Sequence, residues 1–215
     1  MSGSDLSVFL YKIAVGAVPI LLAITVHEVA HGRMARHFGD RTAEMLGRLT
    51  LNPIRHIDPV GTVLVPLLTL WFGNFLFGWA KPVPIGYRNL SNPKRDMVAI
   101  ALAGPGANLA MAIGWALLLQ LVLGARQSLG SSAIYFKDVA QVGILINILL
   151  MLINLVPIPP LDGGRVLRGL VPEPFGRQLD ALERYGLIIV VGLLMLGLLD
   201  PVFQLVRRMS AFLGA

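Results

Sequence analysis

A short run of ionisable residues ends an apolar stretch near the start of the chain. His27-Glu28-Val29-Ala30-His31 follows the apolar segment Val8 to Val26. Residues four apart lie on one face of a helix, so both imidazoles can point at one metal ion. Glu28 is then placed to act as the general base on a water molecule. A helix that merely ended at a membrane interface would explain the charges but not this spacing.

A catalytic zinc site usually takes three protein ligands and keeps one position for water. The chain has no cysteine, so the third ligand must be His, Asp or Glu. The best candidate is Asp162, in the stretch Asn154-Leu-Val-Pro-Ile-Pro-Pro-Leu-Asp162-Gly-Gly-Arg165. Its prolines prevent a regular helix, and the two glycines after Asp162 permit unusual backbone angles. We therefore expect one Zn²⁺ per chain, held by His27, His31 and Asp162, although Asp162 taken alone resembles an ordinary turn residue.

Two asparagines interrupt other apolar segments. Asn108 follows Gly104-Pro105-Gly106-Ala107, whose small residues allow close helix approach, and Asn154 ends a later segment. Either amide could bind a substrate carbonyl or stabilise a developing oxyanion, and we include both among the candidate catalytic residues with Glu28. Each is about equally compatible with a hydrogen bond between helices. His37 and His56 lack the ligand spacing and are interpreted as loop histidines.

The elements that must position these residues are apolar helices. Of the 215 residues, 55% are hydrophobic and 14% charged, against roughly 25% charged in a soluble domain, and the mean hydropathy is +0.72. The apolar segments are Val8–Val26, Val60–Trp79, Met97–Leu123, Val139–Val156 and Tyr185–Leu199. We expect a single all-α domain over residues 1–215: a polytopic membrane bundle of about four to six segments, with a short β-hairpin-like loop after the first helix.

Two segments are irregular or short for a span. Val60–Trp79 contains proline and glycines and is predicted to be re-entrant, and Tyr185–Leu199 needs a C-terminal extension to cross a bilayer.

Residues 1–5 have no basic region before the first apolar run, so we do not expect a removable signal peptide. The stretch Gly47–Asn52 alternates enough to form a strand edge against which an extended substrate could pair.

Basic residues are distributed unevenly between the loops. Of 18 Lys and Arg, thirteen lie in the regions 33–95 and 165–184, which fall on one face if Val60–Trp79 is re-entrant. Basic loops usually stay in the cytosol, so both regions and the candidate zinc site are expected there. The net charge of +6 then reflects membrane topology rather than nucleic-acid binding.

These motifs together resemble the site-2 protease family of intramembrane zinc metalloproteases. The residues concerned are His27–His31, Gly104-Pro105 with Asn108, and Asn154 to Gly164; the stretches Gly47–Pro53, His56–Gly61 and Ala80–Ile85 further resemble its short prokaryotic branch. The resemblance implies zinc binding by His27, His31 and Asp162, water activation by Glu28, and assistance at the substrate by Asn108 and Asn154. It also implies a prokaryotic cell-membrane protein whose active site faces the cytosol.

The predicted function is hydrolysis of peptide bonds in membrane-spanning protein substrates, within or at the cytosolic edge of the lipid bilayer. The competing class is a membrane metal transporter or a non-catalytic zinc-binding scaffold, which would also use intramembrane His and Asp. Glu28 favours the protease, because a transporter has no need of a carboxylate beside the first ligand. The sequence predicts neither the oligomeric state nor the identity of the substrate.

Overall fold

The computed structural model describes residues 3–65, 67–68 and 81–215, and helices dominate this part of the chain. The long helices are α1 (Gly3–His37), α4 (Pro93–Gly124) and α6 (Ser132–Asn154). The shorter α-helices are α2 (Thr42–Met45), α5 (Arg126–Leu129), α7 (Asp162–Leu170), α8 (Glu173–Glu183), α9 (Gly186–Met195) and α10 (Asp200–Leu213). Single turns of other helix types are η1 (Pro53–His56), η2 (Pro59–Leu64) and η3 (Tyr87–Asn89).

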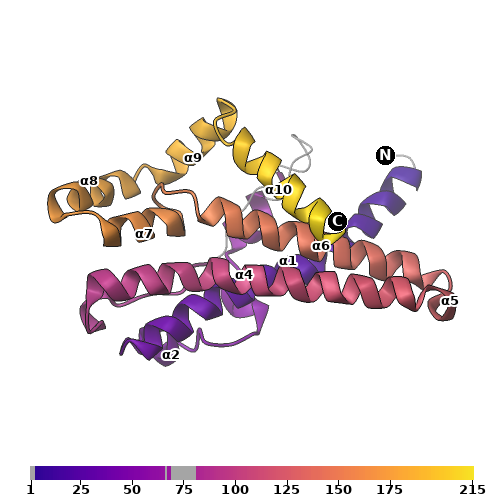
Figure 1. The fold of residues 1–215 in the computed structure, drawn as a ribbon, viewed down its shortest axis with the longest axis horizontal. Coiled ribbons are helices and arrows are strands. Elements are labelled where there is room, and N and C mark those ends of the chain that lie inside the picture. The colour runs from indigo at the N-terminus through magenta and orange to yellow at the C-terminus, as the bar shows by residue number, and fades with distance from the viewer. Residues whose placement is uncertain (1–2, 66, 69–80) are drawn as a thin grey trace.

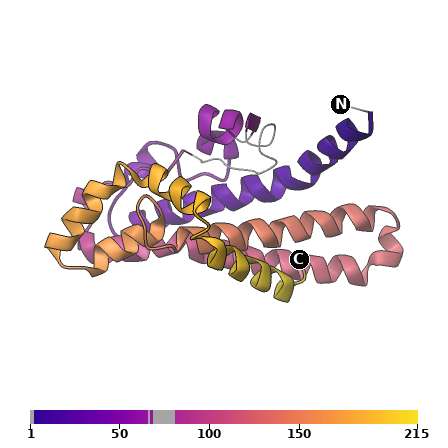
Figure 2. The same cartoon turned by 90° about the horizontal axis from the view of Figure 1, so that it is seen from above.

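Helices α4 and α6 form the centre of the fold. They lie side by side and antiparallel, joined through α5 at one end, whereas α7 and α8 gather at the opposite end (Figures 1 and 2). Their shared core contains Leu119 from α4 and Ile144 and Ile148 from α6, with Val206 of α10 packed against it. Gly143 lets α6 approach closely, because a Cβ there would lie 2.3 Å from the Trp115 ring of α4. Helix α1 packs against both, and α7 packs against α4.

Three helices are long and apolar enough to cross a membrane: residues 6–37 of α1, and all of α4 and α6. Many of their apolar side chains face outward, including Leu121, which is 69% exposed, and Ile134, which is 61% exposed. Lipid can cover such side chains, and water cannot do so without cost. The predicted all-helical membrane bundle is confirmed at this level.

The number of spans is less simple than the apolar segments suggested. The fifth segment is broken, because residues 188–195 and α10 meet at an angle of 79° and form either a broken span or a re-entrant loop. The described helices therefore give three candidate spans, or four if this bent pair counts as one, against the four to six segments that the sequence predicted. Most of Val60–Trp79, and with it the predicted re-entrant segment, lies outside the described residues; its start forms the π-helical η2.

The predicted β-hairpin-like loop is not found in the described residues, which contain no strand between α1 and residue 65. The backbone groups of this loop are used in turns instead. Gly47, at φ +63°, donates its N–H to Glu44 O as α2 ends, and the Asn52 side chain accepts from Ile54 N at the start of η1. The stretch Gly47–Asn52 is therefore not the strand edge that its alternation suggested.

Candidate metal centre

The first helix brings two histidines together on one face. His27 and His31 lie one turn apart in α1, and their Nε2 atoms are 3.0 Å from each other. Both residues are buried, because the turn of α1 that carries them faces α4. The helical spacing predicted from the sequence therefore gives the expected convergence of two ring nitrogens.

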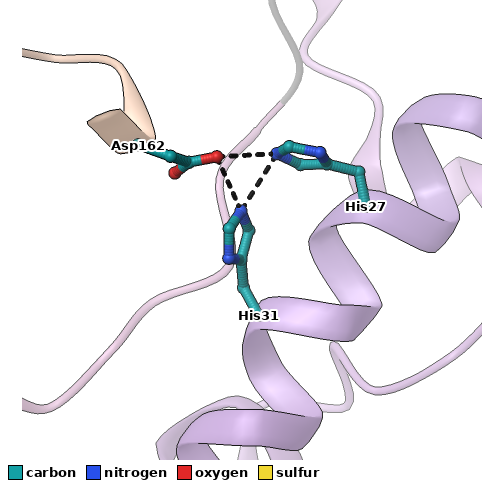
Figure 3. Close-up of side chains that lie close together, drawn as sticks. All are labelled: His27, His31 and Asp162. Atoms are coloured by element: carbon teal, nitrogen blue, oxygen red, sulfur yellow. Dashed lines mark hydrogen bonds and ion pairs between the residues drawn. The ribbon is translucent and has the colours of Figure 1, made fainter. Parts of the chain in front are cut away.

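The third residue comes from a helix more than a hundred residues later. Asp162 begins α7, and its Oδ2 lies 3.1 Å from His27 Nε2 and 3.2 Å from His31 Nε2 (Figure 3). The two glycines after it are needed for space. A Cβ on Gly163 would lie 2.3 Å from Val156 O, and both glycines adopt ordinary helical conformations, contrary to the unusual angles that we expected.

The Nδ1 atoms of both imidazoles, which point away from Asp162, already form hydrogen bonds. His31 Nδ1 lies 2.7 Å from Ile100 O, a carbonyl that can only accept, so Nδ1 carries the hydrogen. His27 Nδ1 lies 2.5 Å from the Oδ1 of Asn108 and donates to it. In the neutral ring the other nitrogen then carries a lone pair, so both Nε2 atoms face Asp162 as acceptors.

Three acceptor atoms that face one another could hold a metal ion between them. Asp162 Oδ2 is buried without a hydrogen-bond donor, and the three ligand atoms lie within 4.8 Å of one another. Their separations of 3.0 to 3.2 Å are close to the edge of roughly 3.3 Å expected for a tetrahedron with bonds of about 2.0 Å. Two imidazoles and one carboxylate are a known donor set for catalytic zinc, so the residues fit this metal.

The two carboxylate oxygens of Asp162 face different groups. Oδ2 lies 3.1 Å from His27 Nε2 and 3.2 Å from His31 Nε2. Arg165 adds a cation at the other carboxylate oxygen, with its Nη1 3.9 Å from Oδ1. Oδ2 is therefore the oxygen that faces the two histidines.

Glu28 is bound by a backbone group from a distant loop. Its Oε2 accepts a hydrogen bond of 2.7 Å from the N–H of Val83. Val83 stands between Pro82 and Pro84, which have no N–H, so it is the one backbone donor among these three residues. The carboxylate next to the first histidine is thus held in place by the segment 81–86.

That segment is itself fastened to the end of α1. The buried Asp40 accepts from Gly86 N at 2.6 Å and from Asn89 Nδ2 at 2.9 Å, and it also accepts from Thr42. Lys81 N donates to His56 O at 3.0 Å. These bonds explain how an extended segment without regular secondary structure reaches Glu28 at a fixed position.

The two asparagines occupy different environments. Asn108 is fully buried beside His27, and its amide nitrogen is bound to Ala23 O and to Asn147 Oδ1. Asn154 is partly buried and donates to Leu150 O one turn earlier in its own helix. No hydrogen bond joins Asn154 to a candidate ligand in the described part of the chain, whereas Asn108 contacts His27 directly.

Several residues near the centre were not identified from the sequence. Asn147, Val83 and Arg165 contact Asn108, Glu28 and Asp162 respectively. Asn147 carries a signal that could have been used: it is polar within the apolar run 139–156 and lies two helical turns before Asn154. The contact of Val83 has no signal in local sequence, because it joins residues 55 apart.

The chain resembles named proteases along most of its length. Residues 130–198 match Peptidase family M50. It is 38% identical over 173 residues to "Putative zinc metalloprotease YwhC" of Bacillus subtilis, covering 80% of this chain and 76% of that protein. It is 31% identical over 198 residues to "Putative zinc metalloprotease Rip2" of Mycolicibacterium smegmatis, covering 90% of this chain and 72% of that protein. No solved structure matches the chain.

These similarities agree with the buried His27–His31–Asp162 cluster and with the apolar helices that surround it. The chain therefore belongs to peptidase family M50, the site-2 protease family of metalloproteases.

Proposed function

We propose that this chain is a zinc-dependent endopeptidase that cleaves membrane-spanning protein substrates within the bilayer or at its cytosolic edge. One observation carries the proposal: three acceptor atoms from His27, His31 and Asp162 converge, buried, where α1, an apolar helix long enough to span, meets α7. We further propose one zinc ion per chain. Zinc there would acidify a water molecule and polarise the scissile carbonyl.

The protein groups have separate tasks in this proposal. Glu28 takes a proton from the attacking water and returns it to the nitrogen of the leaving amine, so no other acid is required. The N–H of Val83 holds Oε2 of Glu28 and leaves Oε1 for the proton. His27, His31 and Asp162 would supply three ligand atoms to the zinc and would leave a further coordination position for water or substrate.

The substrate class follows from the surroundings of the centre. The ligands lie toward the end of α1 and at the start of α7, next to helices with lipid-compatible surfaces. A substrate that reaches this depth must itself be apolar, which favours a transmembrane segment that unwinds locally before attack. The cluster of basic loops favours a cytosolic location for this end of the bundle, and cleavage there would release a cytosolic fragment.

The test combines metal content with cleavage. Detergent-purified wild type is expected to hold about one zinc per chain, and Asp162→Ala to lose it. Proteoliposomes carrying wild type or Glu28→Gln are then fused with membrane vesicles, and new peptide N-termini are mapped by mass spectrometry. N-termini inside apolar segments that appear with wild type alone support the proposal. A folded wild type that takes up no zinc, or new termini confined to soluble loops, would contradict it.

A further inference from the structure

A chain of buried amides connects the first histidine to the middle of α6. Asn108 of α4 lies 2.5 Å from His27 Nδ1, and its Nδ2 donates to Asn147 Oδ1 at 2.8 Å. Asn147 in turn donates to Gly143 O at 2.8 Å. Both asparagines are 0% exposed. We call Asn108 and Asn147 together the asparagine pair.

Backbone carbonyls fix the direction of every hydrogen bond in this series of amides. Asn147 donates to Gly143 O and Asn108 donates to Ala23 O at 3.2 Å, and a carbonyl can only accept. Nδ2 is thereby identified in both amides, which leaves Oδ1 of Asn108 as the atom that faces His27. His27 must then donate from Nδ1, and its Nε2 lone pair is directed toward Asp162.

Reversing the Asn108 amide would be costly at this depth. Its NH₂ group would then face the Nδ1 of His27, and its oxygen would face two other oxygens, those of Ala23 and Asn147. Neither contact can be relieved by water, because both asparagines are fully buried between membrane-spanning helices. Ala23 O and Asn147 together therefore specify the orientation of Asn108, and Asn108 specifies the tautomer of His27.

We propose that the asparagine pair positions the metal ligand His27, with Asn108 as the direct contact and Asn147, together with Ala23 O, holding the Asn108 amide in place. This inference rests on the proposed zinc site. It assigns Asn108 to the side of His27 away from Asp162, so it replaces the oxyanion role considered from the sequence. The pair also joins α1, α4 and α6, which couples the packing of three helices to the geometry of one ligand.

The first experiment measures zinc affinity of the full chain in detergent by competition with a chromophoric chelator. Asn108→Leu removes the acceptor for Nδ1, and we expect a loss of about 10- to 100-fold in affinity. Asn108→Asp keeps an acceptor but loses the amide donor, so its affinity should stay within about threefold while its thermal stability falls. Asn147→Leu should lose less affinity than Asn108→Leu, because Ala23 O still holds the Asn108 amide while the bond to Asn147 is gone.

The control must disturb packing without changing the hydrogen bonds of the asparagine pair. Ile148→Ala serves, because Ile148 is 0% exposed, follows Asn147 in α6 and belongs to the core shared with α4. We expect lower thermal stability and unchanged zinc affinity. Equal losses of affinity in Ile148→Ala and Asn108→Leu would show that the pair acts only through packing, and unchanged affinity in Asn108→Leu would overturn the proposal.

A second readout needs no metal and no activity. In metal-free protein labelled with ¹⁵N-histidine at pH 8, the ring nitrogens of His27 should show a hydrogen on Nδ1, and Asn108→Leu should shift the ring toward a mixture of tautomers. A wild-type His27 with its hydrogen on Nε2 would contradict the proposal, whatever the zinc content. Conversely, the expected tautomer in a protein that takes up no zinc would overturn the proposed function and leave the positioning of His27 intact.

Discussion

Single residues at the centre differ in what they must provide. Glu28 must supply a carboxylate, and Gly104 must supply no side chain at all. A Cβ on Gly104 would lie 2.4 Å from His31 Nε2 and 2.6 Å from His27 Cε1. The glycine of α4 thus leaves the space in which both imidazoles stand, a more specific requirement than the close helix approach expected from Gly104-Pro105-Gly106.

Substitution Gly104→Ala should displace the histidine rings and lower zinc affinity by at least about tenfold, because ligand atoms must keep their positions within a few tenths of an ångström. Gly106→Ala is the matched control: it lies two residues later in α4, and a Cβ added there would meet no neighbouring side chain within 4 Å. Zinc titration of both variants in detergent makes the comparison. Equal affinity in the two variants would show that the rings tolerate the extra methyl group.

Substitution Glu28→Gln should leave zinc bound and reduce the cleavage rate by about 10²- to 10⁴-fold, the usual contribution of a positioned general base. The amide can still accept the hydrogen bond from Val83 N, so the loop should keep its place. Zinc content and cleavage of a membrane-embedded reporter are measured on the same preparation. Cleavage at the wild-type rate would remove Glu28 from the proposed mechanism.

Among the elements, the segment 81–86 depends most on contacts distant in sequence. Asp40, just after α1, holds its end through Gly86 and Asn89. Burial raises the pKa of Asp40, but the bonds from Asn89, Thr42 and Gly86 outweigh burial and lower it below its ordinary value of 3.8. The stabilisation from this carboxylate is therefore present above about pH 4 and is lost as the pH falls through the lowered pKa.

Substitution Asp40→Asn should loosen this segment while leaving zinc in place, because a hydrogen bond to a charged group contributes about 1.5–3 kcal/mol. Trypsin cleavage after Arg88, which lies in η3, should accelerate, and turnover should fall as Val83 holds Glu28 less firmly. Asp58→Asn is the control, since Asp58 caps η2 through Val60 and Gly61. Equal trypsin rates in wild type and Asp40→Asn would show that the hydrogen bonds of Asp40 do not hold the segment 81–86 in place.

For the whole molecule, orientation in the membrane follows from where the charges lie. The α5 turn and the α7–α8 region stand at opposite ends of the α4–α6 pair (Figure 1). Arg126 lies in α5, and Arg177 lies in α8 among the basic residues assigned to the cytosol. The positive-inside pattern therefore predicts that these two arginines lie on opposite sides of the bilayer.

The absence of cysteine makes this prediction easy to test. Arg126→Cys and Arg177→Cys each introduce one thiol at an exposed position. A membrane-impermeant maleimide applied to intact cells should label the first variant and not the second, and lysis should make both reactive. Labelling of Arg177→Cys in intact cells would place α8, and the neighbouring centre, on the outer face.

The sequence by itself determined the helices that are long and apolar enough to span, and it determined the candidate ligands. Long apolar runs have few folded alternatives, and a four-residue spacing defines one helix face whatever surrounds it, so α1, α4, α6 and the convergence of His27 and His31 were predictable. Asp162 was predictable as the third candidate ligand, because the sequence offered no cysteine and no better-placed histidine.

Tertiary structure alone decided the contacts that orient these candidate ligands. Asn147, Val83 and Gly104 act through partners 39 to 77 residues away, and such pairings follow from helix packing rather than from local pattern. In the loop after α1, local pattern suggested an element that the tertiary structure does not form. Its alternation suggested a strand, but with no partner strand in the described residues its backbone groups are bound in turns and helix caps.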